Sequence, residues 1–286
     1  VCDPFATDNF TLCHRKISGA GEIVFLKQKR VMDSTLKKQL QEWAKEYNQP
    51  KYFQEDPCQF PHRFKKKQDI EISGFLASWI SYGKREQIVA KCEIMHQLIG
   101  NNPFEFIKCG PDSFTEIKER AEQKGSRNTF YRFYTYHDLY QLLCRLHEIY
   151  EKYDSLEDAV IDTNEVNIVH KLSLLFEGIK GIPTIKGNSA HKRIALFLRW
   201  MVRQDRIVDF GIWERVASQK DLIIPLDTHV LKTSIKWGLT KRKDASWKTA
   251  QEITKAMTEV FPEDPCLGDF ALFGEGINEA NHPTQE

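Results

Sequence analysis

The sequence predicts an all-α protein, and two observations support this fold class. Apolar residues recur at helical spacing in segment after segment, and no alternating apolar–polar pattern of the kind that marks a strand runs beyond a few residues. With 286 residues, 41% of them hydrophobic, the chain can enclose one large domain or two interlocked lobes. A formal net charge of +1 excludes a global electrostatic field, so any nucleic-acid surface must be a local basic patch.

The first helix is expected soon after Met32. Residues 1–31 are rich in glycine and polar residues and lack helical periodicity, so they are either an extension upstream of the natural start or an ordinary N-terminal arm. Asp33 and Ser34 can then cap a helix. Its apolar stripe consists of Leu36, Leu40, Trp43 and Tyr47.

Further helices follow in order along the rest of the chain. They are expected at residues 69–82, 86–99, 136–153, 165–178, 190–204, 228–239, 246–260 and 267–273. The first two of these are predicted to be buried and joined at Gly83 and Lys84, whereas Pro103 opens a short turn. A loop rich in glycine, proline and lysine at 178–189 leads into helix 190–204.

Composition also excludes several classes of protein. The chain has seven cysteines, but no pair has the CxxC spacing of a zinc or redox site and no four cluster near the C-terminus as an iron–sulfur cluster would require. No apolar run approaches the roughly 20 residues that span a bilayer, and the N-terminus lacks the apolar stretch of a signal peptide. We therefore expect a cytoplasmic protein with reduced thiols, no membrane contact, and no metal or cofactor.

One stretch, residues 184–206, is unusually basic for this nearly neutral protein. Its only acid is Asp205, whereas its basic residues are Lys186, Lys192, Arg193, Arg199, Arg203 and Arg206. They lie on a loop that opens a helix, and the N–H groups of a helix N-terminus next to a tight turn form an anion site. The pattern predicts a phosphate-backbone site; the alternative is an amphipathic helix whose cations are solvated or paired with acids elsewhere.

A second stretch, residues 223–239, brings an apolar segment to Asp227 at the mouth of a helix. Such an acid commonly caps the helix, which stabilises it by about 1 kcal/mol. The run Pro-Leu-Asp-Thr-His-Val, followed by Gly-Leu, also resembles the signature of endonuclease III-like helix-hairpin-helix DNA glycosylases. FLASWISYGKREQIVAK (75–91) resembles an early helix of that superfamily, and KGNSAHKRIALFL (186–198) occupies the place of its hairpin and catalytic lysine.

A closer resemblance covers about 250 residues. On PHRF, the QDIEI helix, SAHKRIALFLRWMVRQD, VDFGIW, LIIPLDTHV and DP…DFALFG, the chain is identified as a member of a bacterial family catalogued only as a domain of unknown function. That family brings no established activity, so function must be argued from the residues.

The chain departs from the superfamily pattern at the hairpin. Leu-Pro-Gly-x-Gly, one residue and then Lys is usual there, whereas the segment from Lys186 to Lys192 contains a single glycine, Gly187. Asp227 follows Lys192 by 35 positions, which is longer than in endonuclease III and similar to archaeal 8-oxoguanine glycosylases. These departures put the mode of phosphate binding in doubt.

The resemblance implies that Lys192 is a nucleophile that forms a Schiff base and that Asp227 is its partner. The carboxylate would stabilise positive charge on the sugar and accept the lysine proton, while His191, Arg193 and the helix N-terminus would supply the positive potential that favours a neutral amine. His229 would orient Asp227 or contact a phosphate. The remaining DNA contacts are assigned to the following residues: Lys186, Gly187, Asn188, Ser189, Arg193, Arg199 and Arg203.

The aromatic run RNTFYRFYTYH offers Tyr131, Phe133 and Tyr134 as a stacking pocket for a flipped base, although core packing is the simpler interpretation for each ring. We expect a two-lobed helix-hairpin-helix glycosylase-like fold within one unit, 32–286. Residues 69–205 would form the middle lobe, and 32–68 with 206–286 the second.

The function expected is that of a monomeric base-excision repair glycosylase and AP lyase on double-stranded DNA carrying a damaged base, such as an oxidised guanine, associated with the nucleoid when bound. Two alternatives remain open. The first is a non-enzymatic nucleic-acid binding module that keeps the fold. The second is a diverged enzyme that acts on a nucleoside-like substrate.

Overall fold

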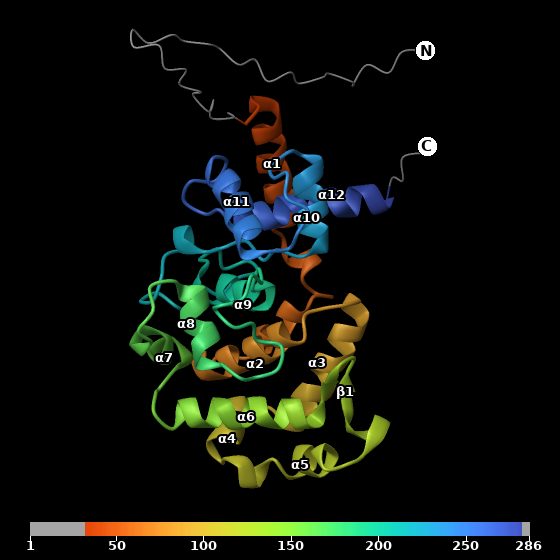
Figure 1. Cartoon of the computed structure of the whole chain (residues 1–286), viewed down its shortest axis with the longest axis vertical. Helices are drawn as coiled ribbons and strands as arrows, with labels where there is room; N and C mark the ends of the chain where they lie inside the picture. Colours follow the sequence, from red (N-terminus) through yellow and green to blue (C-terminus); the bar gives the residue numbers. More distant parts are fainter. Residues whose placement is uncertain (1–31, 282–286) are drawn as a thin grey trace. The chain divides into compact units, whose positions relative to one another are not determined.

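The computed structural model describes residues 32–281, with side chains as far as residue 275. The compact unit begins at Ser34, and the predicted extension 1–31 lies outside the described residues. Helices dominate, as expected for an all-α protein (Figure 1). They are α1 (Ser34–Tyr47), α2 (Lys67–Trp79), α3 (Arg85–Ile99), α4 (Pro103–Lys108), α5 (Thr115–Ala121), α6 (Tyr136–Tyr150), α7 (Leu156–Asp162), α8 (Ile168–Leu175), α9 (Lys192–Val202), α10 (Thr228–Lys236), α11 (Trp247–Thr258) and α12 (Leu267–Asn281).

Short elements fill the connections. Two strands, β1 (Thr129–Tyr131) and β2 (Tyr134–Thr135), form an antiparallel hairpin. Single turns of 3-10 helix occur at Pro50–Tyr52, Pro57–Gln59, Pro61–Arg63, Pro111–Ser113, Gly125–Asn128 and Gln219–Asp221. Proline opens four of these six turns, since its fixed φ suits the first position of a helix and it has no N–H to leave unpaired.

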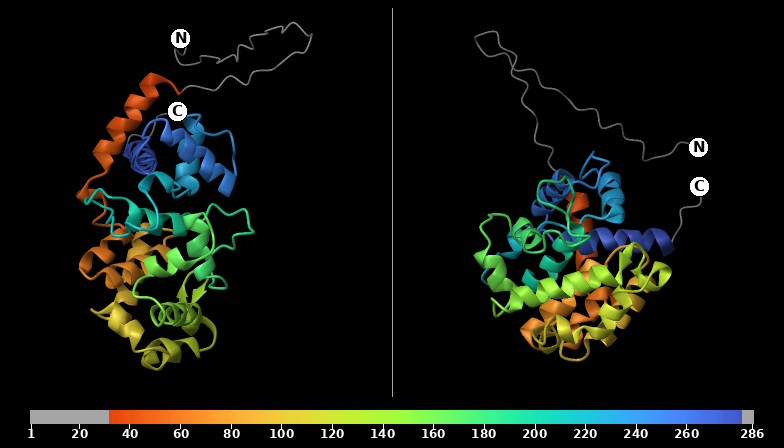
Figure 2. Two further views of the ribbon diagram at one scale, coloured as in Figure 1. Left: turned by 90° about the vertical axis from the view of Figure 1, so that its left-hand side faces the viewer. Right: turned by 60° about the horizontal axis from the view of Figure 1, so that its bottom comes forward.

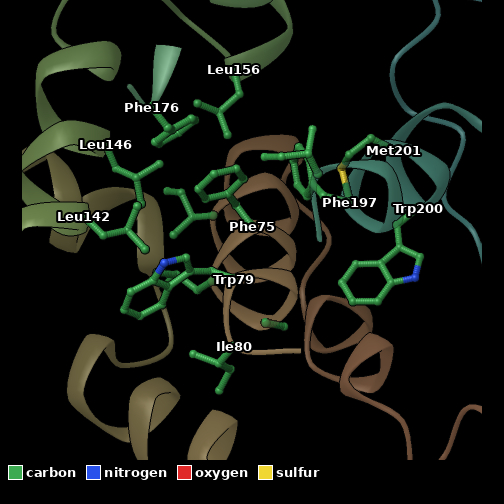
Figure 3. Packing of buried hydrophobic residues seen from close by; sticks show 14 of the residues in the cluster. Phe75, Trp79, Ile80, Leu142, Leu146, Leu156, Phe176, Phe197, Trp200 and Met201 are labelled. Atoms are coloured by element: carbon green, nitrogen blue, oxygen red, sulfur yellow. The ribbon is translucent and has the colours of Figure 1, made fainter. Parts of the chain in front are cut away.

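Helix α2 is the centre of the core. Every residue from Asp69 to Trp79 is buried, which is expected of a helix covered by neighbours on all sides. Phe75 stacks on Phe176 and meets the edge of Phe197, and these rings lie together in the interior (Figure 3). Helices α9, α4 and α3 pack directly against α2.

The two ends of the described chain lie side by side. Helix α1 packs against α12, which it crosses, and α10 also packs on α12 (Figures 1 and 2). Tyr47 at the end of α1 touches Phe273 of α12 edge to face. Gly274 faces the Tyr47 ring so closely that a Cβ there would collide with it, so the close approach of these two helices requires glycine.

Capping contacts and residues with positive φ fix where several helices begin. The α6 start has a capping box in which Thr135 and Asp138 exchange hydrogen bonds, and Asp227 caps α10. Gly83, with φ +97°, turns the chain between α2 and α3, near the junction expected there. Helix α9 begins after His191, which holds a left-handed backbone conformation at φ +49° and gives no side-chain cap.

Candidate functional site

Lys192 is the first residue of α9, and its amine faces two oxygen atoms. Its Nζ donates to the Ser81 carbonyl at 3.2 Å and lies 3.5 Å from Oδ2 of Asp227. About a third of each side chain, 31% and 35%, is exposed. The amine is therefore held by protein on one side and open to solvent on another.

Asp227 caps α10 and faces Lys192 with different oxygen atoms. Its Oδ1 accepts from the backbone N–H of His229 at 2.9 Å and of Val230 at 2.8 Å. These two bonds fix the carboxylate, and Oδ2 is left to face the lysine. Capping and pairing with the lysine are thus compatible roles of one side chain.

Lys192 and Asp227 line a cavity of about 270 Å³. One part of its wall is aromatic, from the two ends of the described chain: Tyr47, Tyr52, Phe53, Phe270 and Phe273. Another part is polar or charged: Gln49, Asp56, Ser81, Arg85, Arg199, His229 and Asp269. An apolar cleft with a few convergent polar groups is the usual form of a small-molecule or base-binding site.

Asp269, in the first turn of α12, is a charged group that the sequence did not reveal as part of the site. It accepts a hydrogen bond from Nη1 of Arg199 and lines the cavity beside Asp227. Burial raises the pKa of Asp269 to about 6, with the charge of Asp227 adding to the effect and Arg199 opposing it. The spacing of Asp269 and Phe273, one helical turn apart, was the available signal that both face the same way.

Sequence comparison places most of this site in a known family. The family described as "Protein of unknown function (DUF2400)" matches residues 56–278. The chain belongs to this family. The segment matched to DUF2400 contains Lys192, Asp227 and Asp269, whereas the cavity residues Tyr47 to Phe53 precede it. No curated protein and no solved structure matches the chain.

Among the side chains between residues 32 and 275 of this DUF2400 member, no cluster of three or more His, Cys, Asp or Glu is placed to hold a metal ion. In the same part of the chain, no helix is long and apolar enough to cross a membrane.

The expectation that Arg199 and Arg203 contact phosphate is wrong. Only 8% and 3% of their side chains are exposed, and both pair with Asp209, which is fully buried. Arg203 also bonds Asp264 at 2.7 Å, while Arg199 bonds Asp269. Guanidinium groups enclosed by carboxylates in this way are held within the protein, and so little of each side chain is exposed that neither can meet the DNA backbone as the sequence suggested.

Arg193 is also occupied within the protein. Its guanidinium donates to the carbonyls of Trp79 and Gly181 and to the Tyr134 hydroxyl, and the residue is half-buried. It therefore joins α9 to the end of α2 and to the loop after α8. These contacts leave Arg193 poorly placed for the phosphate contact expected from the sequence.

His191 does not supply the positive charge expected beside Lys192. The residue is buried, its Nδ1 lies 3.0 Å from the Ser173 hydroxyl, and its ring contacts Trp247. Burial lowers the pKa of His191 to about 4, so the ring is neutral at pH 7. His229, in contrast, is exposed and lines the cavity, where its backbone N–H bonds Asp227.

The loop before α9 keeps the exposure that a backbone contact needs. Lys186, Gly187 and Asn188 are exposed, and Ser189 is half-buried. The loop is tied to the start of α11 through the Asn188 carbonyl, which accepts from the N–H of Trp247, and through its bridge to Ser246. Phosphate binding by this loop stays a prediction.

The predicted base pocket at the β1–β2 hairpin is not the cavity. Tyr131 and Tyr134 are core residues, 3% and 0% exposed, and Phe133 is exposed at the hairpin tip. None of the three lines the cavity around Lys192. The aromatic wall comes instead from α1, α12 and the segment between α1 and α2, which lie far from the RNTFYRFYTYH run in the sequence.

Proposed function

We propose that this protein is a DNA glycosylase with AP lyase activity, in which Lys192 attacks the sugar of a damaged nucleotide. The observation that carries the proposal is the partly exposed Lys192–Asp227 pair, 3.5 Å apart, on the wall of a cavity with an aromatic side. The proposal includes the two-lobed arrangement, with residues 69–205 in one lobe and 32–68 with 206–286 in the other. Double-stranded DNA is the proposed partner.

The proposed chemistry uses these two side chains in a fixed order. An ammonium has no lone pair, so Lys192 first loses a proton to Asp227, and Nζ then bonds to C1′ of the deoxyribose. The bond from C1′ to the base breaks, and its electron pair leaves with the base, which takes the proton that Asp227 had received from Lys192. The restored carboxylate then takes a second proton from Nζ and delivers it to O4′ as the C1′–O4′ bond breaks, which gives the Schiff base. Loss of a C2′ proton to water then expels the 3′ phosphate.

The cavity walls supply what a flipped base needs. The aromatic side chains of Tyr52, Phe53 and Phe273 line the cavity, and a base would stack against them. The carboxylates of Asp56 and Asp269 are acceptors for ring or exocyclic N–H groups, which an oxidised guanine carries. We therefore propose an oxidised purine as the preferred lesion.

Borohydride trapping tests the proposal directly, because reduction of the Schiff base joins protein and DNA. Wild type would be compared with Lys192→Gln on duplexes carrying 8-oxoguanine, an abasic site or no lesion. We expect an adduct with the lesion duplexes that is absent in Lys192→Gln. Lys220→Gln is the matched control, because Lys220 forms an exposed pair with Glu263 away from the cavity.

The other outcomes distinguish the alternatives. Tight, salt-sensitive DNA binding without any adduct would favour a non-enzymatic binding module. Activity on free nucleosides without duplex binding would favour a diverged enzyme on a nucleoside-like substrate.

A further inference from the structure

The tip of the β1–β2 hairpin presents an aromatic ring to solvent. Phe133 is 55% exposed, whereas its neighbours Tyr131 and Tyr134 are buried. One side of the ring is stacked on Tyr82, with centroids 4.7 Å apart and planes 25° from parallel. More than half of a large apolar side chain is thus left in water on an otherwise packed hairpin.

Hydrogen bonds hold the hairpin tip in place. The Tyr131 hydroxyl donates to the Tyr82 carbonyl at 2.6 Å, and the Tyr82 hydroxyl donates to the Tyr131 carbonyl at 3.1 Å. Lys180 Nζ donates to the Phe133 carbonyl at 2.6 Å. The ring is therefore presented by a tip bonded to the end of α2 and to the loop after α8, and an apolar group held out in this way indicates a contact surface.

The tip lies next to the cavity mouth. Tyr82, on which Phe133 stacks, stands between Ser81, whose carbonyl accepts from Lys192, and Gly83, which lines the cavity. A Cβ on Gly83 would collide with the Arg132 guanidinium, so Arg132 lies against this lining residue. Phe133 is thus one stacked ring away from the segment that holds the lysine.

The charge around the tip complements a polyanion. Arg132 is exposed, holds a left-handed backbone at φ +53°, and forms no ion pair with any side chain between residues 32 and 275. Lys84 and Lys180 are exposed on the flanking segments, and Lys180 pairs with Asp138 at 2.9 Å. An exposed aromatic ring bordered by cations, of which Arg132 and Lys84 have no carboxylate partner among the described side chains, is the combination that binds unstacked nucleobases with their phosphates.

We propose that the β1–β2 tip is a second nucleic-acid contact, in which Phe133 stacks on a base of the duplex outside the cavity while Arg132 meets the adjacent backbone. The base is one that loses its stacking partner when the damaged nucleotide enters the cavity. This assignment rests on the proposed function of the Lys192 site, and it gives Phe133 a different role from lining the pocket.

The test measures binding separately from chemistry. Anisotropy titrations would use undamaged duplex and duplex with a single abasic site, which exposes base faces, for wild type, Phe133→Ala, Phe133→Tyr and Val166→Ala. Val166 is the matched control because it is apolar, 96% exposed and away from the cavity. We expect Phe133→Ala to bind the abasic duplex about tenfold more weakly, Phe133→Tyr to recover the loss, and Val166→Ala to match wild type.

A second variant and a probe base examine the contact itself. Arg132→Gln should reduce the slope of log affinity against log salt by about one unit. 2-Aminopurine placed opposite or beside the abasic site should be quenched by wild type and not by Phe133→Ala. Because Phe133 is exposed, its variants should melt at the wild-type temperature, which separates loss of contact from loss of fold.

The outcomes separate this inference from the proposed function. Equal binding and quenching by wild type and Phe133→Ala, with Lys192-dependent adducts retained, would overturn the hairpin contact alone. Phe133→Leu keeps an apolar side chain without a ring, and if it bound the abasic duplex as tightly as Phe133→Tyr, stacking would be overturned as the basis of the contact. If wild type bound no DNA at low salt, both proposals would fail.

Discussion

The two ends of helix α9 carry the same kind of charge in opposite settings. At its first residue, Lys192 faces one carboxylate at 3.5 Å, and about a third of each side chain is exposed. Two turns later, Arg199 pairs with Asp209 and Asp269 with only 8% of its side chain exposed. Arg203, one turn further, bonds Asp205, Asp209 and Asp264.

This difference separates a group available for reaction from groups that hold the fold. Cations enclosed by several carboxylates cannot leave without exposing buried charges, whereas a loosely paired, solvent-accessible lysine can exchange its proton and its partner. Arg199 joins the two settings, because it lines the cavity while it holds Asp269. We infer that the buried cluster holds in place the part of the cavity wall that faces Lys192 and Asp227. The cluster consists of Arg199, Arg203, Asp205, Asp209, Asp264 and Asp269.

The largest expected effect is a loss of activity on substitution of Asp227, the partner of Lys192 at the exposed end of α9. Asp227→Asn should lower the single-turnover rate by about 10²- to 10⁴-fold, because an amide cannot accept the lysine proton. Stability should hardly change, since asparagine caps helices as well as aspartate does. Asp227→Ala is the control: it should lose the rate and also about 1 kcal/mol of the free energy of unfolding. Wild-type turnover by Asp227→Asn would remove Asp227 from the mechanism.

The opposite result is expected in the buried cluster. Asp209→Asn should reduce the free energy of unfolding by about 3 kcal/mol or more, because two buried guanidinium groups lose a shared counter-charge. Urea denaturation measures this loss. Lys220→Gln, in an exposed pair with Glu263, should cost no more than about 1 kcal/mol. Equal costs for the two variants would mean that the cluster is not structural.

The sequence predicted the helices well where an apolar stripe marked them. The helices expected soon after Met32, at 136–153 and at 190–204 appear as α1, α6 and α9, with the last two ending two to three residues earlier than expected. The short helices α5 and α7 escaped notice because about two turns are too few to show a period. The β1–β2 hairpin escaped because strands of three and two residues cannot show alternation.

The site could be predicted only in part. Resemblance to a motif suggested that Lys192 and Asp227 meet, and they lie 3.5 Å apart. The aromatic wall could not be foreseen, since Tyr52 and Phe273 are brought together by packing between the two ends of the described chain. Arg199 and Arg203 were misjudged because a row of arginines has the same pattern whether water or buried carboxylates surround it.

A smaller effect is expected in the pH dependence of stability, and it tests the role of Asp269. This residue both lines the cavity and belongs to the buried cluster. Its folded pKa is about 6, above the ordinary 3.8, so between these values the folded state binds more protons than the unfolded state. Stability from this group is therefore present below about pH 4 and is lost as the pH rises through 6, by no more than about 1.4 kcal/mol per pH unit.

Comparison with Asp269→Asn isolates that contribution from other titrating groups. The difference in unfolding free energy, wild type minus variant, should fall between about pH 4 and pH 6 and become flat above pH 7. Thermal or urea unfolding across this range measures it. A difference that rises with pH would mean that Arg199 dominates burial and holds Asp269 ionised.

The smallest effect is expected on DNA affinity, when a lysine in the loop before α9 is replaced. Lys186 is exposed, unlike Arg199 and Arg203, so it is a cation of the basic stretch that can meet a phosphate. Lys186→Gln should weaken duplex binding a few-fold and reduce the salt slope by about one unit, without changing the melting temperature. Lys118→Gln, on the exposed face of α5, is the control and should leave the slope unchanged. An unchanged slope in both variants would show that Lys186 does not bind phosphate.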